Sequence, residues 1–408
     1  MSCKNKTITS EYVSWGHPDK LADQIADQIL TDISKIDPNV RAGIEVMVKD
    51  NIVVLGGEIT TTAKDINYEL SVKKVFEDIS YPSNHNLTSD KIKVINLIGK
   101  QSPEISSMVD KSNGILGAGD QGFMVGYASY GTDNLMPLGH YLARTICEYV
   151  CTLKIPDEFF GGDDIKFGPD VKTQVVITYD EDNHPTIDHI LISSMHPRGA
   201  ISILKNVVHD SILDNSCGIS EYIFEEYIKN KDIKIDVNPY GEWTIGGPIS
   251  DCGVTGRKIV VDAYGGYCNV GGGATSGKDL SKVDRSGAYM ARYIAKNIVA
   301  TGIADEAKVE LAYVIGDSKP CALNIELDRN CHMVEIIKEW LEKHIDMSPS
   351  GIIERFMKNR SESFDYVKFA KHGSYGHEPS YDYPWEKLDF ADELLDHINQ
   401  YVEDKVLS

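Results

Sequence analysis

The sequence predicts an α+β protein of three structurally related domains, each an antiparallel sheet with helices on one face. Two observations lead to this prediction. The chain has 408 residues, which is longer than one hydrophobic core supports, so two or three domains are expected. A helix, a hairpin and a second helix also recur, at about 18–79, 136–212 and 286–344. A period of roughly 130 residues is too long for a solenoid but fits three such domains.

The first repeat begins with a helix over 18–34. Proline suits the first helical position, and apolar residues follow at helical spacing. His17 and Asp19 therefore lie at the helix N-terminus, where they either cap the helix or meet an anion. Asp23 and Asp27 follow Asp19 at intervals of four residues and share its face, which we interpret as a solvated acidic face.

A hairpin over 40–60 follows, in which two apolar runs are separated by a turn at 49–51. Glu45 and Glu58 fall within these apolar strands. A carboxylate on a half-buried strand is either a residue at the rim of the sheet or a ligand, and both interpretations stay open. An amphipathic helix over 63–79 completes the repeat.

A long polar segment connects the first repeat to the second. Residues 101–119 contain a proline and show no sustained periodicity, so we expect a loop. Loops of this length in compact domains are lids or linkers. The sequence GAGDQG at 117–122 then leads into a strand, FMVGYAS. Asp120 lies between these glycines, either as a turn residue or as a ligand presented by the turn.

The second repeat has the same order of elements. Helices over 136–150 and 197–212 flank a hairpin over 171–194, and Asp170 and Lys172 lie at the entrance of that hairpin.

In the third repeat, helices over 286–300 and 332–344 flank a hairpin over 309–328. Its first strand is apolar nearly throughout, so both faces of the sheet need cover. We expect sheets to pack against each other, within or between subunits. The tail, 345–408, is acidic and aromatic and shows no legible motif.

The segment 246–284 has the most unusual composition. It holds 10 glycines in 39 residues, whereas glycine averages about 7%. Backbone N–H groups and basic side chains suit phosphate oxygens, and aspartates suit a hard divalent cation bound to those phosphates. We therefore predict a polyphosphate and metal site. Its charged residues include Arg257, Lys258, Lys278, Lys282, Asp251, Asp262, Asp279 and Asp284. Trp243, just ahead of the segment, either packs in the core or offers a stacking face for a base.

Two other interpretations of this segment are open. Gly272 to Lys278 fits the G-x-x-x-x-G-K part of a P-loop, but Asp279 follows where a P-loop has Ser or Thr. A strand predicted over 258–263 also lies about ten residues before these glycines, which is too far for a P-loop. A mobile surface loop is the second alternative, and the many charges set among apolar residues argue against it.

Composition and charge exclude several classes of protein. No run of about 20 apolar residues exists, so no membrane span is predicted, and the N-terminus lacks the apolar region of a secretory signal. The 8 cysteines show no zinc-site or redox spacing, so we expect reduced thiols and a cytoplasmic location. A formal net charge of −21 argues against a nucleic-acid partner. An anionic substrate needs a local basic pocket, and the cluster at 257–282 is the candidate.

Several of these motifs together resemble one family. They are SWGHPDK at 14–20, GGEITT at 56–61, GAGDQG at 117–122, and the runs GGPISDCGVTGRKIVVDAYGG and GGGATSGKDLSKVDRS. In this order they resemble S-adenosylmethionine synthetase, also called methionine adenosyltransferase. The resemblance runs from about Ile8 to Lys387, and it includes YGH at 375–377 and PWEK at 384–387.

The resemblance implies a fold and a reaction. The family has three related α+β domains about a pseudo-threefold axis, expected here at 1–113, 114–245 and 246–408. It is a dimer of dimers with active sites between subunits. The sulfur of L-methionine attacks C5′ of ATP and expels triphosphate, which the same site hydrolyses to phosphate and diphosphate. Two other functions stay open: an ATP hydrolase or kinase of another fold, and a catalytically silent relative that binds nucleotide and regulates a partner.

The resemblance also implies residue roles, and no enzyme nucleophile is required because the sulfur attacks. The residues expected to act on the triphosphate are His17, Lys172, Arg257 and Lys278. Those expected to bind ATP are His17, Asp170, Lys172, Trp243, Asp251, Arg257, Lys258, Ala274 and Lys278. Those expected to bind methionine are Glu58, Gln101, Asp120, Asp251 and Lys282, with Asp120 reaching across the dimer interface. Asp19 and Asp284 are expected to hold Mg²⁺, about two ions per site, and Glu45 to hold K⁺. Gln101 to Ser112 corresponds to a mobile gate.

The chain departs from the family pattern at three places. Trp15 stands where the family has glutamate, Thr275 where it has phenylalanine, and Glu242-Trp243 where it has Arg-Phe. Trp243 still offers a π-face for adenine, whereas Glu242 lacks the positive charge of the usual arginine. None of these changes removes a predicted metal ligand or a phosphate-binding lysine.

Overall fold

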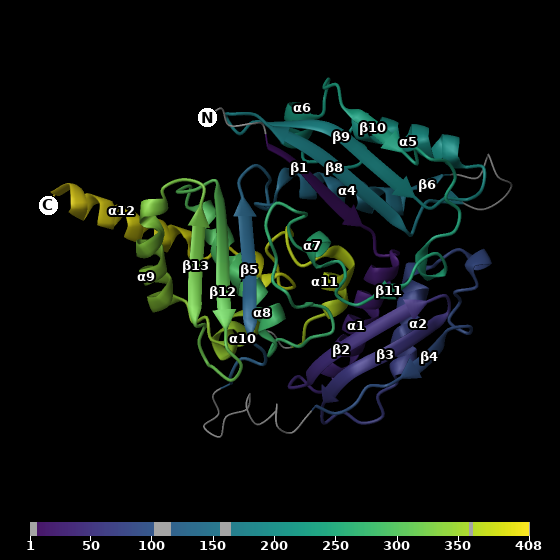
Figure 1. Ribbon diagram of the computed structural model, residues 1–408, viewed down its shortest axis with the longest axis horizontal. Coiled ribbons are helices and arrows are strands. Elements are labelled where there is room, and N and C mark those ends of the chain that lie inside the picture. Colours follow the sequence, from purple (N-terminus) through teal and green to yellow (C-terminus); the bar gives the residue numbers. More distant parts are fainter. Residues whose placement is uncertain (1–5, 102–115, 156–164, 359–361, 408) are drawn as a thin grey trace.

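The computed structural model describes residues 6–101, 116–155, 165–358 and 362–407, and it confirms the predicted α+β class (Figure 1). Three sheets with mainly antiparallel pairing carry helices. The helix, hairpin and helix of each repeat are present in the predicted order. No described helix is long and apolar enough to cross a membrane, and every cysteine in the described ranges is a free thiol.

The first repeat forms the sheet at the lower right of Figure 1. Its elements are α1 (Pro18–Ser34), β2 (Arg41–Lys49), β3 (Ile52–Thr60), α2 (Tyr68–Ile79) and β4 (Lys93–Asn96), joined later by β11 (Gly253–Val254). The strand order is β11-β2-β3-β4. The helix α1 packs on β2 and on α2. The hairpin turns at Asp50, whose φ is 52°, as the sequence predicts for 49–51.

The second repeat forms the sheet at the top of Figure 1. Its elements are β1 (Lys6–Val13), α4 (Leu138–Thr152), β8 (Val171–Tyr179), β9 (Pro185–Ser194), α5 (Ile201–Leu213), α6 (Glu221–Tyr227) and β10 (Lys234–Val237). The strand order is β1-β8-β9-β10. The helix α4 packs on β1 and β8. A separate two-stranded ladder joins β6 (Lys154–Ile155) to β7 (Ile165–Lys166).

The third repeat forms the sheet at the left of Figure 1. Its elements are β5 (Gly122–Ser129), α8 (Val283–Ala300), β12 (Glu306–Tyr313), β13 (Ala322–Leu327) and α9 (Val334–His344), followed by α10 (Pro349–Met357), α11 (Tyr366–His372) and α12 (Ala391–Leu407). The strand order is β13-β12-β5, and α8 packs on β5 and β12. The short helix α11 packs on α1, which ties the tail to the first repeat.

Each sheet takes one strand from a distant part of the chain. The strand β1 precedes α1 in sequence but pairs with β8, so that Val13 lies opposite Lys172. In the same way β5 pairs with β12, and β11 pairs with β2. The chain therefore crosses the middle of the molecule repeatedly. The turn that carries His17, just after β1, comes to lie beside the start of β8.

Two apolar cores result from this arrangement. One core joins the first and third repeats, with Ile29 of α1 and Ile294 of α8 among its fully buried members. The other lies within the second repeat, around Leu142 and Val175. Because α1 and α8 belong to one core, the chain segments at their N-terminal ends are held on a common rigid support.

The tail packs an aromatic cluster and a buried ion pair against α8. Trp385 is fully buried and stacks on Tyr289, with ring centroids 3.8 Å apart. The Glu386 carboxylate accepts hydrogen bonds from Arg292 at 3.0 Å and from Lys296 at 2.8 Å. A buried carboxylate needs such partners, so the tail adds structure to the third repeat although it shows no legible motif.

The strand predicted over 258–263 is wrong. Its β-branched residues favour a strand, but Ile259–Asp262 forms a helical turn, α7. The Asp262 amide donates to the Lys258 carbonyl at 2.9 Å. One helical turn brings these two side chains to the same side, where each pairs with a residue of α1. The tertiary ion pairs override the local preference, and the strand that a P-loop requires is absent from this described segment.

Candidate active site

The N-terminus of α1 presents His17 as its capping residue. The His17 Nδ1 atom accepts a hydrogen bond from the Asp19 amide at 3.1 Å, which leaves the proton of a neutral ring on Nε2. Burial, and then the ammonium groups of Lys172 and Lys258, lower the pKa of His17 to about 2. The ring is therefore neutral near pH 7 and offers Nε2–H as a hydrogen-bond donor.

Asp19, in the first turn of α1, gathers groups from the glycine-rich segment. Its carboxylate accepts from the Lys258 ammonium at 2.6 Å and from the Val254 amide at 3.0 Å, and the Arg257 guanidinium lies 3.6 Å away. The Asp19 side chain is 3% exposed, whereas that of Arg257 is 54% exposed. The guanidinium thus remains open to an anion beside the helix N-terminus, where negative charge is favoured.

Asp170, at the start of β8, faces the beginning of the glycine-rich segment. One carboxylate oxygen accepts from the Gly247 amide at 2.8 Å. The other, Oδ1, is buried and has no partner among the described residues. Burial raises the pKa of Asp170 to about 6, while the Gly247 hydrogen bond and the charge of Lys172 act in the opposite direction. A buried acceptor without a donor suits a ligand hydroxyl.

Trp243 precedes this segment and is half-buried. Its indole N–H donates to the Ile245 carbonyl at 2.8 Å, and its own carbonyl accepts from the His196 amide at 2.9 Å. Within the described ranges it belongs to neither apolar core, so the interpretation of Trp243 as a core residue is not supported. We call the following set the first cluster: His17, Asp19, Asp170, Lys172, Trp243, Asp251, Arg257 and Lys258.

The second half of the glycine-rich segment docks on β2. Lys278 forms a bridge with Gly43 of that strand, and its ammonium donates to Asp284 at 2.6 Å. Gly273 passes directly over this pair, because a Cβ at Gly273 would lie 2.2 Å from the Asp284 carboxyl carbon. Only glycine permits so close an approach of backbone to a carboxylate.

The hairpin brings two of the predicted carboxylates to the same place. Glu45 lies on the exposed face of β2, within electrostatic range of Lys278. Glu58 lies opposite Gly43 on the neighbouring strand β3 and forms a bridge with Gly99, so that Gln101 follows close by. The positions of Glu45, Glu58 and Gln101 therefore agree with one site beside the docked loop.

Lys282 and Asp120 lie at the start of α8. The Lys282 ammonium donates to Asp279 at 2.7 Å. A Cβ at Gly119 would lie 3.8 Å from the Lys282 side chain, so the backbone just before the exposed Asp120 passes beside Lys282. The remainder of the predicted gate, 102–112, lies outside the described residues. We call the following set the second cluster: Glu45, Glu58, Gln101, Asp120, Lys278, Lys282 and Asp284.

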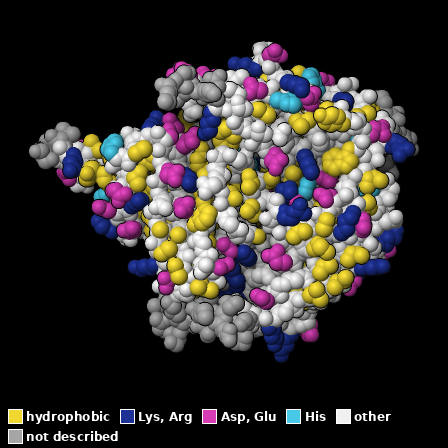
Figure 2. Space-filling view, in the orientation of Figure 1, with side chains coloured by type: hydrophobic (Ala, Val, Ile, Leu, Met, Phe, Trp, Pro, Cys, Tyr) yellow, Lys and Arg dark blue, Asp and Glu magenta, His cyan; other side chains and the backbone are white. Residues whose placement is uncertain are grey.

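The structure thus collects the predicted residues in two clusters along the glycine-rich segment. Ala274 connects them, because a Cβ at Gly256 would lie 2.6 Å from that of Ala274. Figure 2 shows Lys and Arg side chains next to acidic ones right of centre, near the position of β11 in Figure 1. The clusters bring five Lys and Arg side chains together with seven carboxylates in a chain of net charge −21.

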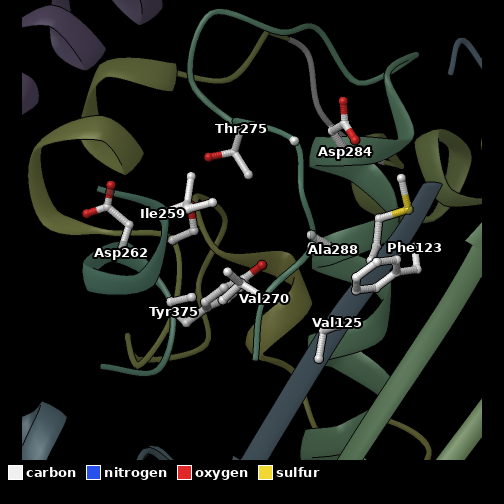
Figure 3. Close-up of a pocket in the computed structure, with 14 residues that line it drawn as sticks. Phe123, Val125, Ile259, Asp262, Val270, Thr275, Asp284, Ala288 and Tyr375 are labelled. Carbon is white, nitrogen blue, oxygen red and sulfur yellow. The ribbon is translucent and has the colours of Figure 1, made fainter. Parts of the chain in front are cut away.

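A pocket opens beside the second cluster, between the segment after α7 and the layer formed by β5 and α8 (Figure 3). Thr275 and Asp284 place oxygen atoms at one end of it. Phe123, Val125 and Val270 line an apolar part. A pocket with one polar end and one apolar end suits a small amphipathic ligand.

The acidic face of α1 is buried, which corrects its interpretation as a solvated face. Asp23 is 2% exposed and Asp27 is 0% exposed. Asp23 accepts from the Gly256 amide at 2.9 Å. Asp27 accepts from the Gly277 amide at 2.7 Å and from Arg285 at 2.6 Å. The glycine-rich segment covers this face of the helix, and its buried amides need acceptors there.

Two further buried groups, Lys20 and Arg285, escape the sequence reasoning. Lys20 donates to Asp262 of α7 in a buried pair, and Arg285 is fully buried at the start of α8. Burial also raises the pKa of the Asp23 carboxyl well above its ordinary value. The recurrence of aspartates every four residues indicated that they share one face of α1. The sequence does not show which segment covers that face.

The donor set suits a cation that arrives with a polyphosphate. The described residues contain no group of three or more His, Cys, Asp or Glu that could hold a metal by themselves. Asp19 and Asp284 each stand as a single carboxylate beside a lysine. Mg²⁺ is usually bound by one or two carboxylates together with phosphate oxygens and water, so these residues fit that mode.

Two of the three departures have a structural explanation. Glu242 accepts from the Gly199 amide at 2.7 Å and so holds a turn. Trp15 lies under the Lys371 ammonium, 5.2 Å from the ring centroid, and packs edge-on against His372. Thr275, the third, lines the pocket of Figure 3.

Comparison with known proteins identifies the family. Family models described as the N-terminal, central and C-terminal domains of S-adenosylmethionine synthetase match residues 5–103, 115–243 and 245–387. An S-adenosylmethionine synthase of Mycoplasmopsis pulmonis is 39% identical over 393 residues, covering 95% of this chain and 97% of that protein. The solved structure of an unusual S-adenosylmethionine synthetase from Campylobacter jejuni matches with a TM-score of 0.83 at 34% identity, covering 96% of this chain and 99% of that one. The chain therefore belongs to the S-adenosylmethionine synthetase family.

Proposed function

We propose that this enzyme makes S-adenosylmethionine from ATP and L-methionine. The sulfur of methionine attacks C5′ of the ribose, the C5′–O bond breaks, and the triphosphate leaves with the electron pair of that bond. The observation that carries the proposal is the convergence of exposed Lys172 and Arg257 with neutral His17 at the N-terminus of α1. Such a site holds a polyanion that gains charge as the bond breaks.

The first cluster binds mainly ATP, and the second cluster binds methionine and one side of the nucleotide. In the first cluster, Lys172, Arg257 and Lys258 contact the triphosphate, and His17 donates Nε2–H at the reacting end. Asp170 accepts from the ribose or base, and the ring of Trp243 stacks on adenine. Asp251 touches both substrates. No group of the protein attacks, so the protein contributes alignment and charge neutralisation.

In the second cluster, Lys278 contacts the triphosphate from the opposite side, and Ala274 lies against the nucleotide. Glu58, Gln101, Asp120 and Lys282 bind methionine. The support for this assignment is that β2, β3 and the start of α8 bring these side chains together around one docked loop. After transfer, the same cations hold the triphosphate for hydrolysis to phosphate and diphosphate.

The enzyme is proposed to use Mg²⁺ and K⁺. Asp19 and Asp284 hold Mg²⁺, about two ions per site, together with phosphate oxygens. Glu45 holds K⁺ near the second cluster. Bound Mg²⁺ would neutralise charge on the leaving triphosphate, and the lysines beside each aspartate keep that carboxylate in place until the ion arrives with its nucleotide.

The protein is proposed to act as a homo-oligomer, a dimer of dimers with sites between subunits and with units at 1–113, 114–245 and 246–408. Its outer sheet faces support this, because in a single chain they expose apolar side chains over β2, β3 and β4 (Figure 2) and on β5. The exposed residues include Met47, Ile52, Ile95, Leu97 and Phe123. Pairing of two chains would cover them and would set the first cluster of one against the second cluster of the other.

One assay tests the function. The purified protein is incubated with ATP, methyl-labelled methionine, Mg²⁺ and K⁺, and the products are identified by mass spectrometry. The proposal requires a labelled sulfonium of S-adenosylmethionine together with phosphate and diphosphate. An ATP hydrolase would release phosphate without methionine, and a silent nucleotide-binding relative would bind ATP and give neither product.

A further inference from the structure

We propose that Asp27 and Arg285 are positioning residues: their buried ion pair fixes the Lys278 peptide and thereby aims the Lys278 ammonium at the triphosphate. Neither residue is among those that the motifs assign to a substrate or a metal. The inference rests on the proposed role of Lys278 and goes further, because it explains how a lysine on a glycine-rich loop keeps one direction.

The Asp27–Arg285 pair forms hydrogen bonds to the backbone on both sides of Lys278. Asp27 uses one carboxylate oxygen for the Gly277 amide at 2.7 Å and the other for Arg285 at 2.6 Å. Arg285 in turn donates a second N–H to the Lys278 carbonyl at 2.9 Å. The residue before Lys278 and the carbonyl of Lys278 itself are therefore held by one ion pair that spans α1, the loop and α8. Charge-assisted hydrogen bonds of this kind are stronger and shorter than neutral ones.

The loop has this support in addition to its docking on β2, where the Gly277 carbonyl accepts from the Ile44 amide at 3.0 Å. Gly277 has a φ of +79°, and a Cβ there would lie 2.1 Å from the Ile44 carbonyl oxygen. Glycine is thus required at this position, and glycine gives the chain its greatest conformational freedom. Three more glycines, 271–273, precede it in the same loop. The ion pair therefore acts together with the bridge to Gly43 in fixing the direction of the Lys278 side chain.

The pair also reaches the partner of Lys278. Arg285 directly follows Asp284, which accepts from the Lys278 ammonium at 2.6 Å. The Arg285 guanidinium lies over the Tyr366 ring, 4.9 Å from its centroid, and both Asp27 and Arg285 are 0% exposed. They have no route to a phosphate of their own. Their effect on the reaction must pass through Lys278 and Asp284.

The chain offers a matched control on the same helix. Glu386 and Arg292 also form an ion pair with both side chains 0% exposed, at 3.0 Å. Their other hydrogen bonds go to Tyr127, Asn134, Leu135, Lys296 and the tail, and none of those partners belongs to the glycine-rich segment. A substitution there tests what loss of a buried pair does to folding alone.

The test is a double-mutant cycle with the full-length oligomer. Four variants are compared with the unaltered enzyme: Asp27→Asn, Lys278→Met, the double variant, and Glu386→Gln. The measurements are kcat for S-adenosylmethionine formation, kcat for hydrolysis of added tripolyphosphate, and the melting temperature. We expect Asp27→Asn to lower both kcat values by about 30-fold or more, approaching the loss of about 10²–10³ for a missing donor to a developing anion. In the Lys278→Met background the same change should cost at most about threefold.

Glu386→Gln should lower the melting temperature as Asp27→Asn does, with kcat within about twofold of the unaltered enzyme. If Asp27→Asn lowers kcat by the same factor in the enzyme with Lys278 and in the Lys278→Met variant, the positioning role is wrong. If Asp27→Asn does not fold, Arg285→Lys replaces it, because an ammonium keeps the charge but lacks the fork that reaches two acceptors. The proposed function fails separately, if the unaltered enzyme forms no S-adenosylmethionine.

Discussion

Asp170 should make the use of ATP dependent on pH near 6. The carboxyl is 2% exposed, burial raises its pKa to about 6, and its Oδ1 atom has no partner among the described residues. Only the carboxylate accepts hydrogen bonds at both oxygens, so protonation should weaken its contact with ATP. With a pKa of about 6, the ionised fraction falls from about 90% at pH 7 to about 10% at pH 5. We therefore expect kcat/KM for ATP to fall about tenfold between these pH values, since this ratio reports the free enzyme.

The ionisation of Asp170 also changes the free energy of unfolding, and the direction of that change follows from the shift in its pKa. Its folded pKa lies above the ordinary value of 3.8, so between pH 3.8 and about 6 the folded state binds more protons than the unfolded state. The free energy of unfolding should fall as pH rises through this window, by on the order of 3 kcal/mol from this group. Asp170→Asn should remove that dependence, because the amide does not titrate and its oxygen still accepts from Gly247.

The assay is kcat/KM for ATP from pH 4.5 to 8 at saturating methionine and Mg²⁺, with Asp170→Asn as the matched variant. The variant should be slower at pH 7 and should lose the inflection near pH 6. An inflection that persists unchanged in Asp170→Asn would belong to the phosphate groups of ATP or to another residue, and the assignment of Asp170 would then be wrong.

Three further predictions follow from the site. Lys278→Met should lower kcat by about 10²–10³ while keeping the apolar stem, because one preorganised charge on the leaving triphosphate is lost. Lys308→Met, which breaks a surface pair of 3.0 Å on β12, is its control, and a loss below about fivefold for Lys278→Met would contradict the assignment. Asp19→Asn and Asp284→Asn should each raise the Mg²⁺ concentration for half-maximal rate, since an amide binds a hard cation more weakly; unchanged Mg²⁺ titrations in both would remove them from the metal site. Trp243→Ala should weaken ATP binding by roughly 1–3 kcal/mol, while Trp243→Phe retains it. A lower melting temperature with unaltered ATP affinity would show that Trp243 acts only in packing.

Local physics made the order of elements predictable. The periodicity of apolar residues in α1, the β2–β3 hairpin and α8 requires only neighbouring residues, and each element was found where the pattern placed it. The motifs also carried the resemblance, because glycines, lysines and aspartates in a fixed order identify a family before its fold is known. The predicted ligands at the start of α1 and in the glycine-rich segment were named from the sequence on that basis.

Partners distant in sequence were decided by the tertiary structure alone. Asp23 and Asp27 look solvated because their neighbours in sequence are polar, yet amides more than 230 positions later cover them. The run 258–263 favours a strand by its side chains, yet two ion pairs with α1 turn it into a helical turn.

The sequence by itself therefore determined the fold class, the element order, the family and the chemical type of the site. The exchange of β1, β5 and β11 between sheets, and with it the meeting of His17 with Lys172, was decided only when the chain folded back on itself. The reason is that periodicity and composition reflect interactions between residues close in sequence. Burial of a charge depends instead on which distant segment supplies its counter-charge. Asp27 and Arg285, separated by 258 positions and fully buried together, are the clearest case.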